Sequence, residues 1–417
     1  MAMIPAESSV SPRCRLCDAP LSQTFVDLGM SPPCEDFLTA DRLDAMERFY
    51  PLHVRICSEC LLVQLPDYVD PVDVFVEYAY FSSFSDSWVE HAKRYAMRMI
   101  DKLELSEDSL VVEVASNDGY LLQHFVAAGI PVVGVEPAAN IAAVAVEKGI
   151  PTEVCFLGQQ TGIDIAARYG RADLVAANNV YAHVPDLIDF TRGLRALVAD
   201  DGWVTIEVQH LLRLIERKQY DTIYHEHFQY YTALTIARAL ASGGLTLVDI
   251  EELPTHGGSI RAYARPAEVA GEPSVAVTRL LAEEAAAGLD TVEGHAGFAG
   301  AVAQIRNDVL DFLISAARQG KTVVGYGAPG KGNTLLNHCG VRADLLAYTV
   351  DRNPYKHGRF LPGTHIPVHP PEVIAQTRPD YVFVLPWNLR TEISEQLDYV
   401  REWGGRLVFP VPRLEIV

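Results

Sequence analysis

Two segments of this chain have the strand–turn–helix pattern that surrounds a bound nucleotide with backbone N–H groups, and they constrain the fold more than any other feature. Each begins with β-branched apolar residues, continues through small residues and runs into a helical pattern. They are Val111-Val-Glu-Val-Ala-Ser-Asn-Asp-Gly-Tyr120 and Val323-Val-Gly-Tyr-Gly-Ala-Pro-Gly-Lys-Gly332. One such segment indicates a cofactor site. Two indicate a protein in which a cofactor and a nucleotide-linked substrate meet, as in a transferase.

Strand and helix patterns alternate along most of the chain, which is typical of α/β domains with parallel sheets. We expect helices near 87–103, 121–128 and 185–199, and over 275–319 with an interruption around 294–297. We expect strands near 109–115, 131–136, 151–155, 173–178, 202–208, 245–251, 259–264, 322–326, 346–350, 380–385 and 406–410. The helical stretch before residue 321 is then a hinge between two lobes.

Composition and charge exclude several classes of protein. The chain has 417 residues and a formal net charge of −20, which argues against a nucleic-acid partner because phosphate backbones are held mainly by clustered Lys and Arg. No apolar run approaches the roughly 18 residues that span a bilayer, and the N-terminus lacks the pattern of a signal peptide. We therefore expect a cytoplasmic protein of two or three domains with no membrane contact.

Four of the seven cysteines form two Cys-x-x-Cys pairs, Cys14/Cys17 and Cys57/Cys60. Paired thiolates at this spacing suit a tetrahedral zinc site, which can stabilise a loop-rich segment that lacks a core. Because four thiolates fill the coordination sphere, such a zinc ion is structural. The alternative is a reduced or redox-active pair. The other cysteines, Cys34, Cys155 and Cys339, are expected to be ordinary buried or half-buried thiols.

The first strand–turn–helix segment matches the pattern of methyltransferases that use S-adenosylmethionine, in which the first strand ends in an acidic residue followed by small residues and Gly. Glu136, at the end of the next strand, is placed to accept hydrogen bonds from the ribose hydroxyls. The alternative is an ordinary tight turn, which also uses small residues. The candidate cofactor-binding residues are Glu113, Ala115, Asn117, Gly119, Tyr120, Glu136, Pro137 and Asn178.

The segment Tyr224-His225-Glu226-His227 concentrates side chains suited to proton transfer. A histidine is a suitable base because its unperturbed pKa, about 6.5, lies near neutral pH, and Tyr or His donors can stabilise an enolate oxygen. A metal site is the weaker interpretation, since His-Glu-His lacks the i, i+4 spacing of helical zinc motifs. A histidine pair with a purely structural role is the other alternative.

The chain resembles the sugar C-methyltransferases, which act on nucleotide-linked 4-keto-deoxysugars in antibiotic and surface-glycan pathways. The resemblance covers nearly the whole length. Six features carry it, in order along the chain: the two cysteine pairs, Glu-Val-Ala-Ser-Asn-Asp-Gly119, Thr222-Ile-Tyr-His-Glu-His-Phe228, His256-Gly-Gly-Ser259, Gly325-Tyr-Gly-Ala-Pro-Gly-Lys331 and Gly358-Arg-Phe-Leu-Pro-Gly-Thr-His365.

The resemblance implies an α/β protein with a zinc-binding module at 1–78, a central Rossmann-like methyltransferase domain at 79–270 and a C-terminal Rossmann-like nucleotide-sugar domain at 271–417. It also implies S-adenosylmethionine and structural zinc as cofactors, and an active site between lobes. We expect a monomer.

The resemblance also assigns catalytic roles. His227 is the expected general base, Glu226 orients and tunes it, and Tyr224 lies beside the sugar or enolate. His183 is expected to polarise the keto oxygen. Tyr78 is the remaining active-site residue, although the nearby Tyr80 is an alternative, as is a role for both tyrosines in packing the zinc module.

The second strand–turn–helix segment fits the dinucleotide fingerprint literally, and Asp351 follows the next strand. Taken alone it predicts an NAD-dependent oxidoreductase. Pro329 and Lys331 depart from that fingerprint, and the resemblance implies that this lobe holds the nucleotide diphosphate of the sugar instead. For Arg359, the alternative is an arginine on an exposed loop with no role in binding. The candidate contacts are Lys331, Arg359, Asn333, Trp387 and Asn388.

The function implied by the resemblance is S-adenosylmethionine-dependent methylation of the carbon next to the ketone of a dTDP-4-keto-6-deoxysugar. C3 is preferred and C5 is possible, since a 4-ketone activates both. The alternatives are an NAD-dependent oxidoreductase acting on a nucleotide sugar and an O-methyltransferase. A non-catalytic carbohydrate-binding protein would leave the His-Glu-His segment without a role.

Overall fold

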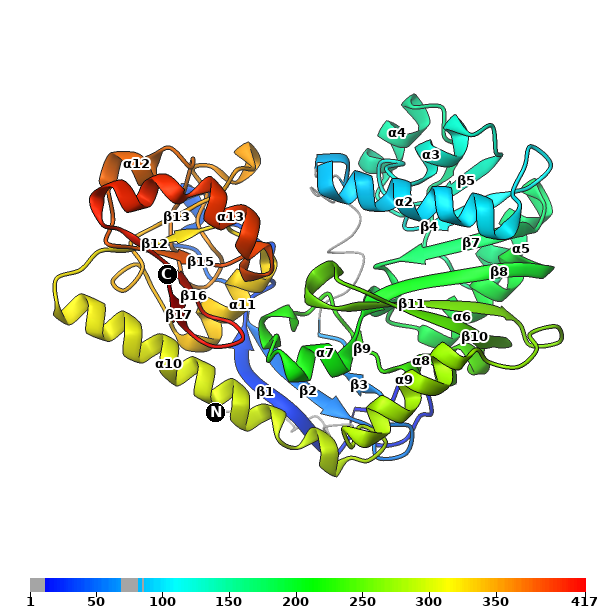
Figure 1. Ribbon diagram of the computed structural model, residues 1–417, viewed down its shortest axis with the longest axis horizontal. Helices are drawn as coiled ribbons and strands as arrows, with labels where there is room; N and C mark the ends of the chain where they lie inside the picture. Colours follow the sequence, from blue (N-terminus) through cyan, green and yellow to red (C-terminus); the bar gives the residue numbers. More distant parts are fainter. Residues whose placement is uncertain (1–11, 69–81, 85) are drawn as a thin grey trace, which may run out of the picture. The chain divides into compact units, whose positions relative to one another are not determined.

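The computed structural model describes residues 12–68, 82–84 and 86–417, which divide into two compact units (Figure 1). The first unit comprises Met1–Gln23, Ile56–His210 and Phe228–Val292, and the second comprises Thr24–Arg55, Leu211–His227 and Glu293–Val417. The His-Glu-His segment therefore belongs to the same unit as the C-terminal part of the chain, although in sequence it lies within the expected middle domain. The three expected domain ranges stay a prediction.

The first unit contains a seven-stranded sheet in the order β10-β11-β8-β7-β4-β5-β6. The strands from β8 to β6 pair in parallel, whereas β11 is antiparallel to both β8 and β10. The chain leaves β4 through β5 and β6 and then returns to the other side of β4 as β7. Ligands of such sheets bind beyond the carboxyl ends of the strands where the order reverses, so a cofactor is expected at the ends of β4 and β7.

The elements of the first unit are β3 (Val63–Gln64), η2 (Ser82–Phe84), α2 (Asp86–Leu103), β4 (Val111–Val114), α3 (Leu122–Ala127), β5 (Val132–Val135), α4 (Ala139–Glu147), β6 (Thr152–Glu153), α5 (Gln159–Tyr169), β7 (Ala172–Asn178), η3 (Tyr181–His183), α6 (Leu187–Leu197), β8 (Val198–Gln209), β9 (Gln229–Tyr230), α8 (Ala233–Ser242), β10 (Leu245–Leu253), η5 (Thr255–Gly257), β11 (Ser259–Pro266) and α9 (Val275–Ala286).

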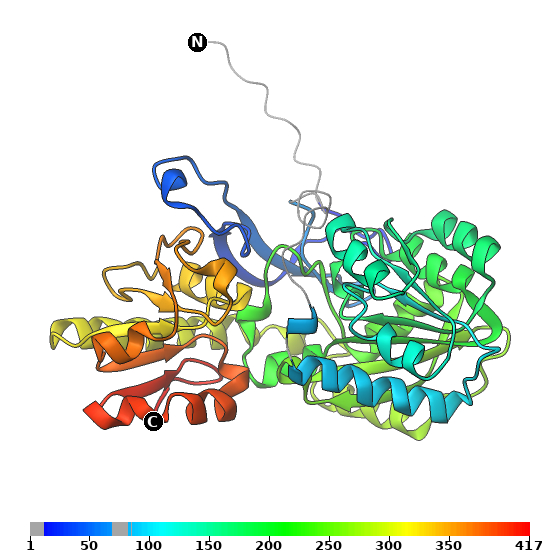
Figure 2. The same cartoon turned by 90° about the horizontal axis from the view of Figure 1, so that it is seen from above.

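Helices cover both faces of this sheet, which explains why β4 and β5 are buried along their whole length and rich in valine. One apolar cluster includes residues of α6 and α8 and also three cysteines, Cys14, Cys57 and Cys60. The cluster on the other face is formed with α2 and α3, and Figure 2 shows α2 (cyan) running along that face. The cysteine pairs thus share their core with the sheet.

The second unit contains a six-stranded sheet in the order β14-β13-β12-β15-β16-β17, in which only β17 pairs antiparallel. The strand order reverses between β12 and β15. The elements are β1 (Gln23–Ser31), η1 (Ala40–Arg42), β2 (Tyr50–Ile56), α7 (Leu211–Glu216), η4 (Tyr220–Thr222), η6 (Glu293–His295), α10 (Phe298–Arg318), β12 (Val323–Tyr326), α11 (Gly330–Cys339), β13 (Thr349–Val350), η7 (Pro354–Lys356), β14 (Val368–His369), α12 (Val373–Thr377), β15 (Tyr381–Val384), η8 (Trp387–Leu389), α13 (Arg390–Gln396), η9 (Asp398–Trp403), β16 (Arg406–Phe409) and β17 (Glu415–Ile416).

The predicted α/β fold class is confirmed, and every expected strand and helix overlaps an observed element. Two strands are shorter than expected, since β6 and β13 pair with their neighbours over only two residues each. Strand β8 is longer and begins directly after α6 at Val198. Among the described residues, no helix has both the length and the apolar composition of a membrane span.

Candidate active site

The loop after β4 has an alternating backbone conformation that places it at the predicted cofactor position. Ala115, Asn117 and Gly119 have positive φ values of 57°, 49° and 78°, and the residues between them do not. A Cβ at Gly119 would lie 2.4 Å from Ile150 Cδ1, so the Ile150 side chain would have to shift. Within this turn, the N–H groups of Ser116 and Asn117 donate to the Val135 carbonyl and to Glu136, so the end of β5 holds the turn in place.

Two buried carboxyl groups lie at this loop. The Oε2 atom of Glu136 accepts a hydrogen bond from the backbone N–H of Asn117 at 3.0 Å, and its Oε1 accepts one from Ala138 at 2.9 Å. Burial raises the pKa of Glu136. Burial, with Glu136 and Asp118 as further causes, raises the pKa of Glu113 well above its usual range. Neither carboxyl oxygen of Glu113 has a hydrogen-bond partner in the described part of the chain, so the loop has polar capacity that a ligand can satisfy.

The remaining candidate cofactor residues border the same loop. Tyr120 is buried and stacks on Trp88 of α2, with ring centroids 6.3 Å apart. Pro137 follows Glu136 and is half-buried. Asn178 ends β7, and its buried Oδ1 atom has no partner among the described residues. The ends of β4, β5 and β7 therefore offer small residues, two acids and an amide, which fit the methionine and ribose parts of S-adenosylmethionine.

His183 follows β7 in η3 and is half-buried in the first unit. The short helix is anchored on both sides, because Tyr181 hydrogen bonds to Thr191 at 2.7 Å and the carbonyl of Ala182 accepts the N–H of Phe228 at 2.8 Å. His183 therefore lies beyond the carboxyl end of β7, and its role stays a prediction. The expected active-site residue Tyr78, and its alternative Tyr80, lie outside the described residues.

A backbone contact fixes the ring of His227 in the second unit. Its Nδ1 atom lies 2.8 Å from the carbonyl oxygen of Thr222. A carbonyl oxygen can only accept, so Nδ1 carries the hydrogen and Nε2 carries the lone pair of the neutral ring. The ring of Tyr224 lies over that of His227, with centroids 3.9 Å apart. Sequence patterns could not indicate the Thr222 carbonyl as a partner, because a main-chain acceptor leaves no signature in residue types.

The two residues between Tyr224 and His227 point into the protein. His225 is buried against Tyr50, with ring centroids 5.8 Å apart, and burial lowers its pKa to about 4, so it is neutral at pH 7. Glu226 is also buried, and burial, reinforced by the nearby Glu35, raises its pKa to about 8. The Cys34 thiol donates a weak hydrogen bond to Glu226 Oε1 over 3.8 Å. A neutral carboxyl group therefore sits beside the candidate base.

The glycine-rich turn after β12 packs against the protein itself. A Cβ at Gly327, whose φ is 86°, would lie 2.6 Å from Pro386 Cδ. Asp351 does not extend towards a ribose, because its Oδ2 atom accepts the N–H of Ala328 within the turn at 2.7 Å. A Cβ at Gly330 would lie 2.8 Å from the sulfur of Cys34. The glycines and the aspartate of the dinucleotide fingerprint therefore serve to form and pack this turn.

The five candidate nucleotide contacts lie in three places. Lys331, Trp387 and Asn388 form one cluster, in which the Lys331 ammonium donates to Asn388 Oδ1 at 2.9 Å and lies 5.0 Å from the Trp387 ring centroid. Asn333 is buried and donates to the carbonyl of Cys34 at 2.6 Å. Arg359 is exposed on a loop, where its Nε donates to the carbonyl of Tyr355 at 3.0 Å. Whether any of them contacts a nucleotide stays a prediction.

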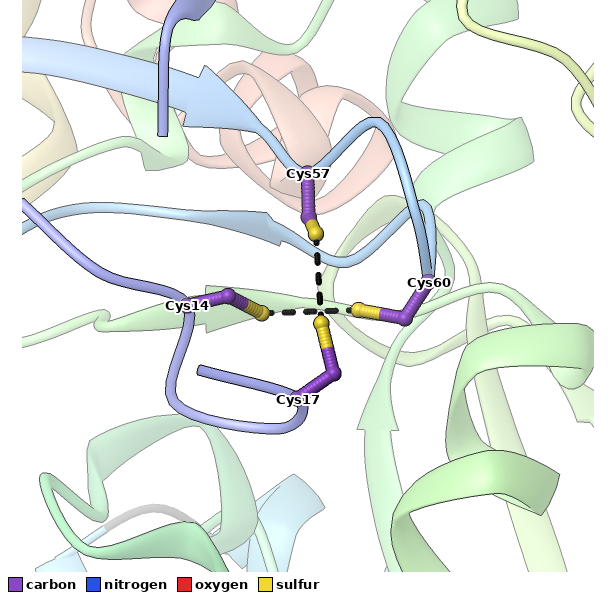
Figure 3. Close-up of side chains that lie close together, drawn as sticks. All are labelled: Cys14, Cys17, Cys57 and Cys60. Carbon is purple, nitrogen blue, oxygen red and sulfur yellow. Dashed lines mark hydrogen bonds between the residues drawn. The ribbon is translucent and has the colours of Figure 1, made fainter. Parts of the chain in front are cut away.

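The four cysteines of the Cys-x-x-Cys pairs converge on one point (Figure 3). Their sulfur atoms all lie within 4.8 Å of one another, with 3.4 Å between Cys14 and Cys60 and 3.5 Å between Cys17 and Cys57. No disulfide joins them. A zinc ion with four Zn–S bonds of about 2.3 Å requires S···S separations near 3.8 Å, so the residues fit a closed structural site.

The two pairs have the same backbone geometry. In each, the residue four positions after the first cysteine donates its N–H to the carbonyl of that cysteine, Asp18 to Cys14 at 2.9 Å and Leu61 to Cys57 at 3.0 Å. Both residues have positive φ, 60° and 63°. The Cys14 sulfur also accepts a hydrogen bond from Gln64 Nε2 at 3.1 Å. Donors of this kind stabilise a metal-bound thiolate.

The seven-stranded sheet, the loop after β4 and the four converging cysteines together define an α/β methyltransferase with a structural zinc site. Family models match residues 14–75 as a zinc binding domain, 88–250 as a methyltransferase domain and 254–412 as a C-methyltransferase C-terminal domain. The chain is 35% identical to the C-methyltransferase NovU of Streptomyces niveus over 404 residues, which cover 97% of this chain and 96% of that protein. The chain therefore belongs to the C-methyltransferases, with a small molecule as substrate and with S-adenosylmethionine and zinc as cofactors.

Two solved structures resemble less than half of the chain. A S-adenosylmethionine-dependent methyltransferase from Clostridium acetobutylicum covers 42% of this chain and 91% of its own, with 11% identity and a TM-score of 0.35. One from Anabaena variabilis covers 46% and 99%, with 12% identity and a TM-score of 0.33. These matches are too distant to support any statement about substrate. The second glycine-rich segment, taken alone, suggested an NAD-dependent oxidoreductase. Because the chain belongs to the C-methyltransferases, that alternative is wrong.

Proposed function

We propose that this C-methyltransferase adds a methyl group to the carbon next to the ketone of a nucleotide-linked 4-keto-6-deoxysugar, with His227 as general base. The observation that carries the proposal is the hydrogen bond from His227 Nδ1 to the Thr222 carbonyl, which leaves the lone pair on Nε2. Formation of a carbon–carbon bond needs a carbanion equivalent, and a ketone provides one by acidifying the neighbouring C–H.

The chemistry begins with removal of that proton. Nε2 of His227 takes the proton, and the electrons of the C–H bond pass into the enolate. The imidazolium so formed keeps its Nδ1–H bond to Thr222, so the ring does not have to move. The electrophile is the sulfonium methyl group that S-adenosylmethionine supplies when bound, and the enolate carbon attacks it. The products are the C-methylated sugar nucleotide and S-adenosylhomocysteine.

Other residues of the proposed site stabilise charge. Tyr224, whose ring is tilted by 33° against that of His227, is the proposed donor to the enolate oxygen, and His183 is proposed to polarise the keto oxygen. Because burial raises the pKa of Glu226 to about 8, this residue is proposed to stay neutral beside the base. An ionised Glu226 would stabilise the imidazolium form of His227 and so slow the release of its proton. Arg359 is an exposed cation suited to a diphosphate.

Our choice of substrate rests on the resemblance to sugar C-methyltransferases and on the relationship to NovU, whose name states C-methylation. We propose a dTDP-linked sugar and transfer to C3. We place the reaction in the cytoplasm, where a site of four reduced thiols is stable.

The test is incubation of the enzyme with S-adenosylmethionine carrying a ¹³C-labelled methyl group and a panel of dTDP-4-keto-6-deoxysugars that differ at C3. The expected product has a new C–CH₃ group on C3, visible by ¹³C NMR. A methyl group on C5 would show that the enzyme methylates C5 and not C3, by the same enolate chemistry. A methyl group on oxygen, or no product from any member of the panel, would refute the proposal.

A further inference from the structure

A buried polar cluster in the second unit lies directly beside the segment that carries His227. Asp221, in η4, is fully buried, and its Oδ2 atom accepts a hydrogen bond from the indole N–H of Trp387 at 2.5 Å. The face of the same indole lies 5.0 Å from the ammonium of Lys331, which donates to Asn388 Oδ1. Trp387 therefore stands between an anion and a cation and contacts both.

The cluster joins parts of the chain that are far apart in sequence. Lys331 lies in the first turn of α11, Trp387 and Asn388 begin η8, and Asp221 lies more than 100 residues before either. The buried Oδ1 atom of Asp221 has no hydrogen-bond partner among the described residues. Burial raises the pKa of Asp221 to about 6 and lowers that of Lys331, and each charge offsets part of the shift of the other. Asp221 is fully buried and Lys331 is half-buried, so the anion depends on this cation for its stability.

Asp221 is followed by the residue that orients the base. The carbonyl of Thr222 accepts the hydrogen bond from His227 Nδ1. The next carbonyl, that of Ile223, accepts a hydrogen bond from Thr334 Oγ1 of α11 at 3.0 Å. Helix α11 and η8 thus hold the backbone on both sides of the Thr222 carbonyl.

We propose that Asp221 is a positioning residue, and that its pairing with Trp387 and Lys331 fixes the Thr222 carbonyl and so the ring of His227. Lys331 then acts within the protein as the counter-charge of Asp221. The glycine-rich turn ending in Lys331, which by sequence suggested a phosphate site, instead orients the catalytic base. This inference rests on the proposed function, because it needs His227 to be the base.

The test is a double-mutant cycle with Lys331→Met, Asp221→Asn and the double variant, assayed for methyl transfer. Lys331→Met leaves a buried carboxylate without its cation, so the loop shifts. Because a displacement of 1 Å can lower a rate about 10²-fold, we expect kcat to fall between about 10-fold and 100-fold, with KM for the sugar nucleotide changed less than about 2-fold. Asp221→Asn keeps an acceptor for the indole and removes the charge, so the double variant recovers most of kcat.

A role of Lys331 in binding phosphate would give a different result. If Lys331 binds phosphate, Lys331→Met raises KM, and adding Asp221→Asn restores nothing, which overturns the proposal. The matched control is Lys321→Met, which breaks the exposed pair with Asp380 on the same sheet and is expected to leave kcat and KM unchanged. Trp387→Phe keeps an aromatic ring for contact with Lys331 and removes the indole N–H that donates to Asp221, and it should lower kcat without loss of folding if Lys331→Met proves unstable.

A second readout needs no substrate. In protein labelled with ¹⁵N-histidine, the ring nitrogens of His227 are expected to report a single Nδ1–H tautomer in the wild type and a mixture in Lys331→Met. An unchanged tautomer together with unchanged kcat refutes the positioning role. If the wild-type enzyme methylates no ketosugar but the tautomer still depends on Lys331, the proposed function fails and the positioning role stands.

Discussion

Glu226 should make the second unit less stable as the pH rises from 6 to 8, and Glu226→Gln should remove that dependence. Burial, with Glu35 as the second cause, raises the pKa of Glu226 to about 8 from an ordinary value of 4.5. The folded protein therefore holds the proton more tightly than the unfolded chain does. The stabilising contribution is complete below the unfolded pKa and is lost as the pH rises through the folded pKa.

The magnitude follows from the two pKa values. With pKa values of 8 folded and 4.5 unfolded, proton linkage contributes about 2.7 kcal/mol at pH 6 and about 0.4 kcal/mol at pH 8. The free energy of unfolding should therefore fall by roughly 2 kcal/mol over this range because of Glu226 alone. The glutamine variant keeps a neutral side chain of the same size beside Cys34, so its pH dependence should be flatter by that amount.

The assay is urea unfolding at pH 6, 7 and 8, followed by tryptophan fluorescence. A Trp88→Phe/Trp203→Phe background leaves two indoles, both in the second unit, so the signal reports that unit. The control is Glu402→Gln, which changes an exposed glutamate and should keep the wild-type pH dependence. Equal pH dependence in the wild type and Glu226→Gln would show that Glu226 is ionised at pH 7 and refute the reasoning.

Three further predictions concern the first unit. Cys57→Ser should abolish zinc binding, measured by metal analysis of the purified protein, and should lower the thermal midpoint by an amount that zinc addition does not restore; a full zinc content would exclude the four-cysteine site. Gly119→Ala should weaken S-adenosylmethionine binding by about 10-fold or more in calorimetry, because the new methyl group meets Ile150 at 2.4 Å and the positive φ is strained. Arg261→Met removes the arginine that pairs with the buried Glu207 and leaves His91 and Thr255 as its partners, so the free energy of unfolding should fall by about 3 kcal/mol; a loss below 1 kcal/mol would contradict the importance of that pair.

Local patterns explain how much of the fold was predictable. β4 and the turn after it could be recognised because a run of buried valines ends in small residues, and each step depends only on neighbouring positions. The same holds for the cysteine pairs, whose spacing alone indicated four thiolates on one ion. In each case the structure confirms the geometric part, namely the strand ends and the converging sulfur atoms.

The environment of the candidate base could not be predicted in the same way. The ring of His227 is fixed by a carbonyl oxygen, which every residue possesses and no residue type marks. Asp221 meets Trp387 only because two distant segments fold together. Lys331 is predicted to contact a phosphate because it follows a glycine-rich turn, and nothing nearby in sequence indicates that the ring of Trp387 links it to the buried Asp221.

Whether His227 is the base is tested by comparing His227→Asn with the wild type in transfer of a ¹³C-labelled methyl group from S-adenosylmethionine to the ketosugar. Asparagine can still donate an amide N–H towards the Thr222 carbonyl but has no basic nitrogen. If His227 is the base, the rate falls by about 10²-fold or more, while binding of S-adenosylmethionine and of the sugar nucleotide is unchanged. Methyl transfer at the wild-type rate by His227→Asn would contradict that role.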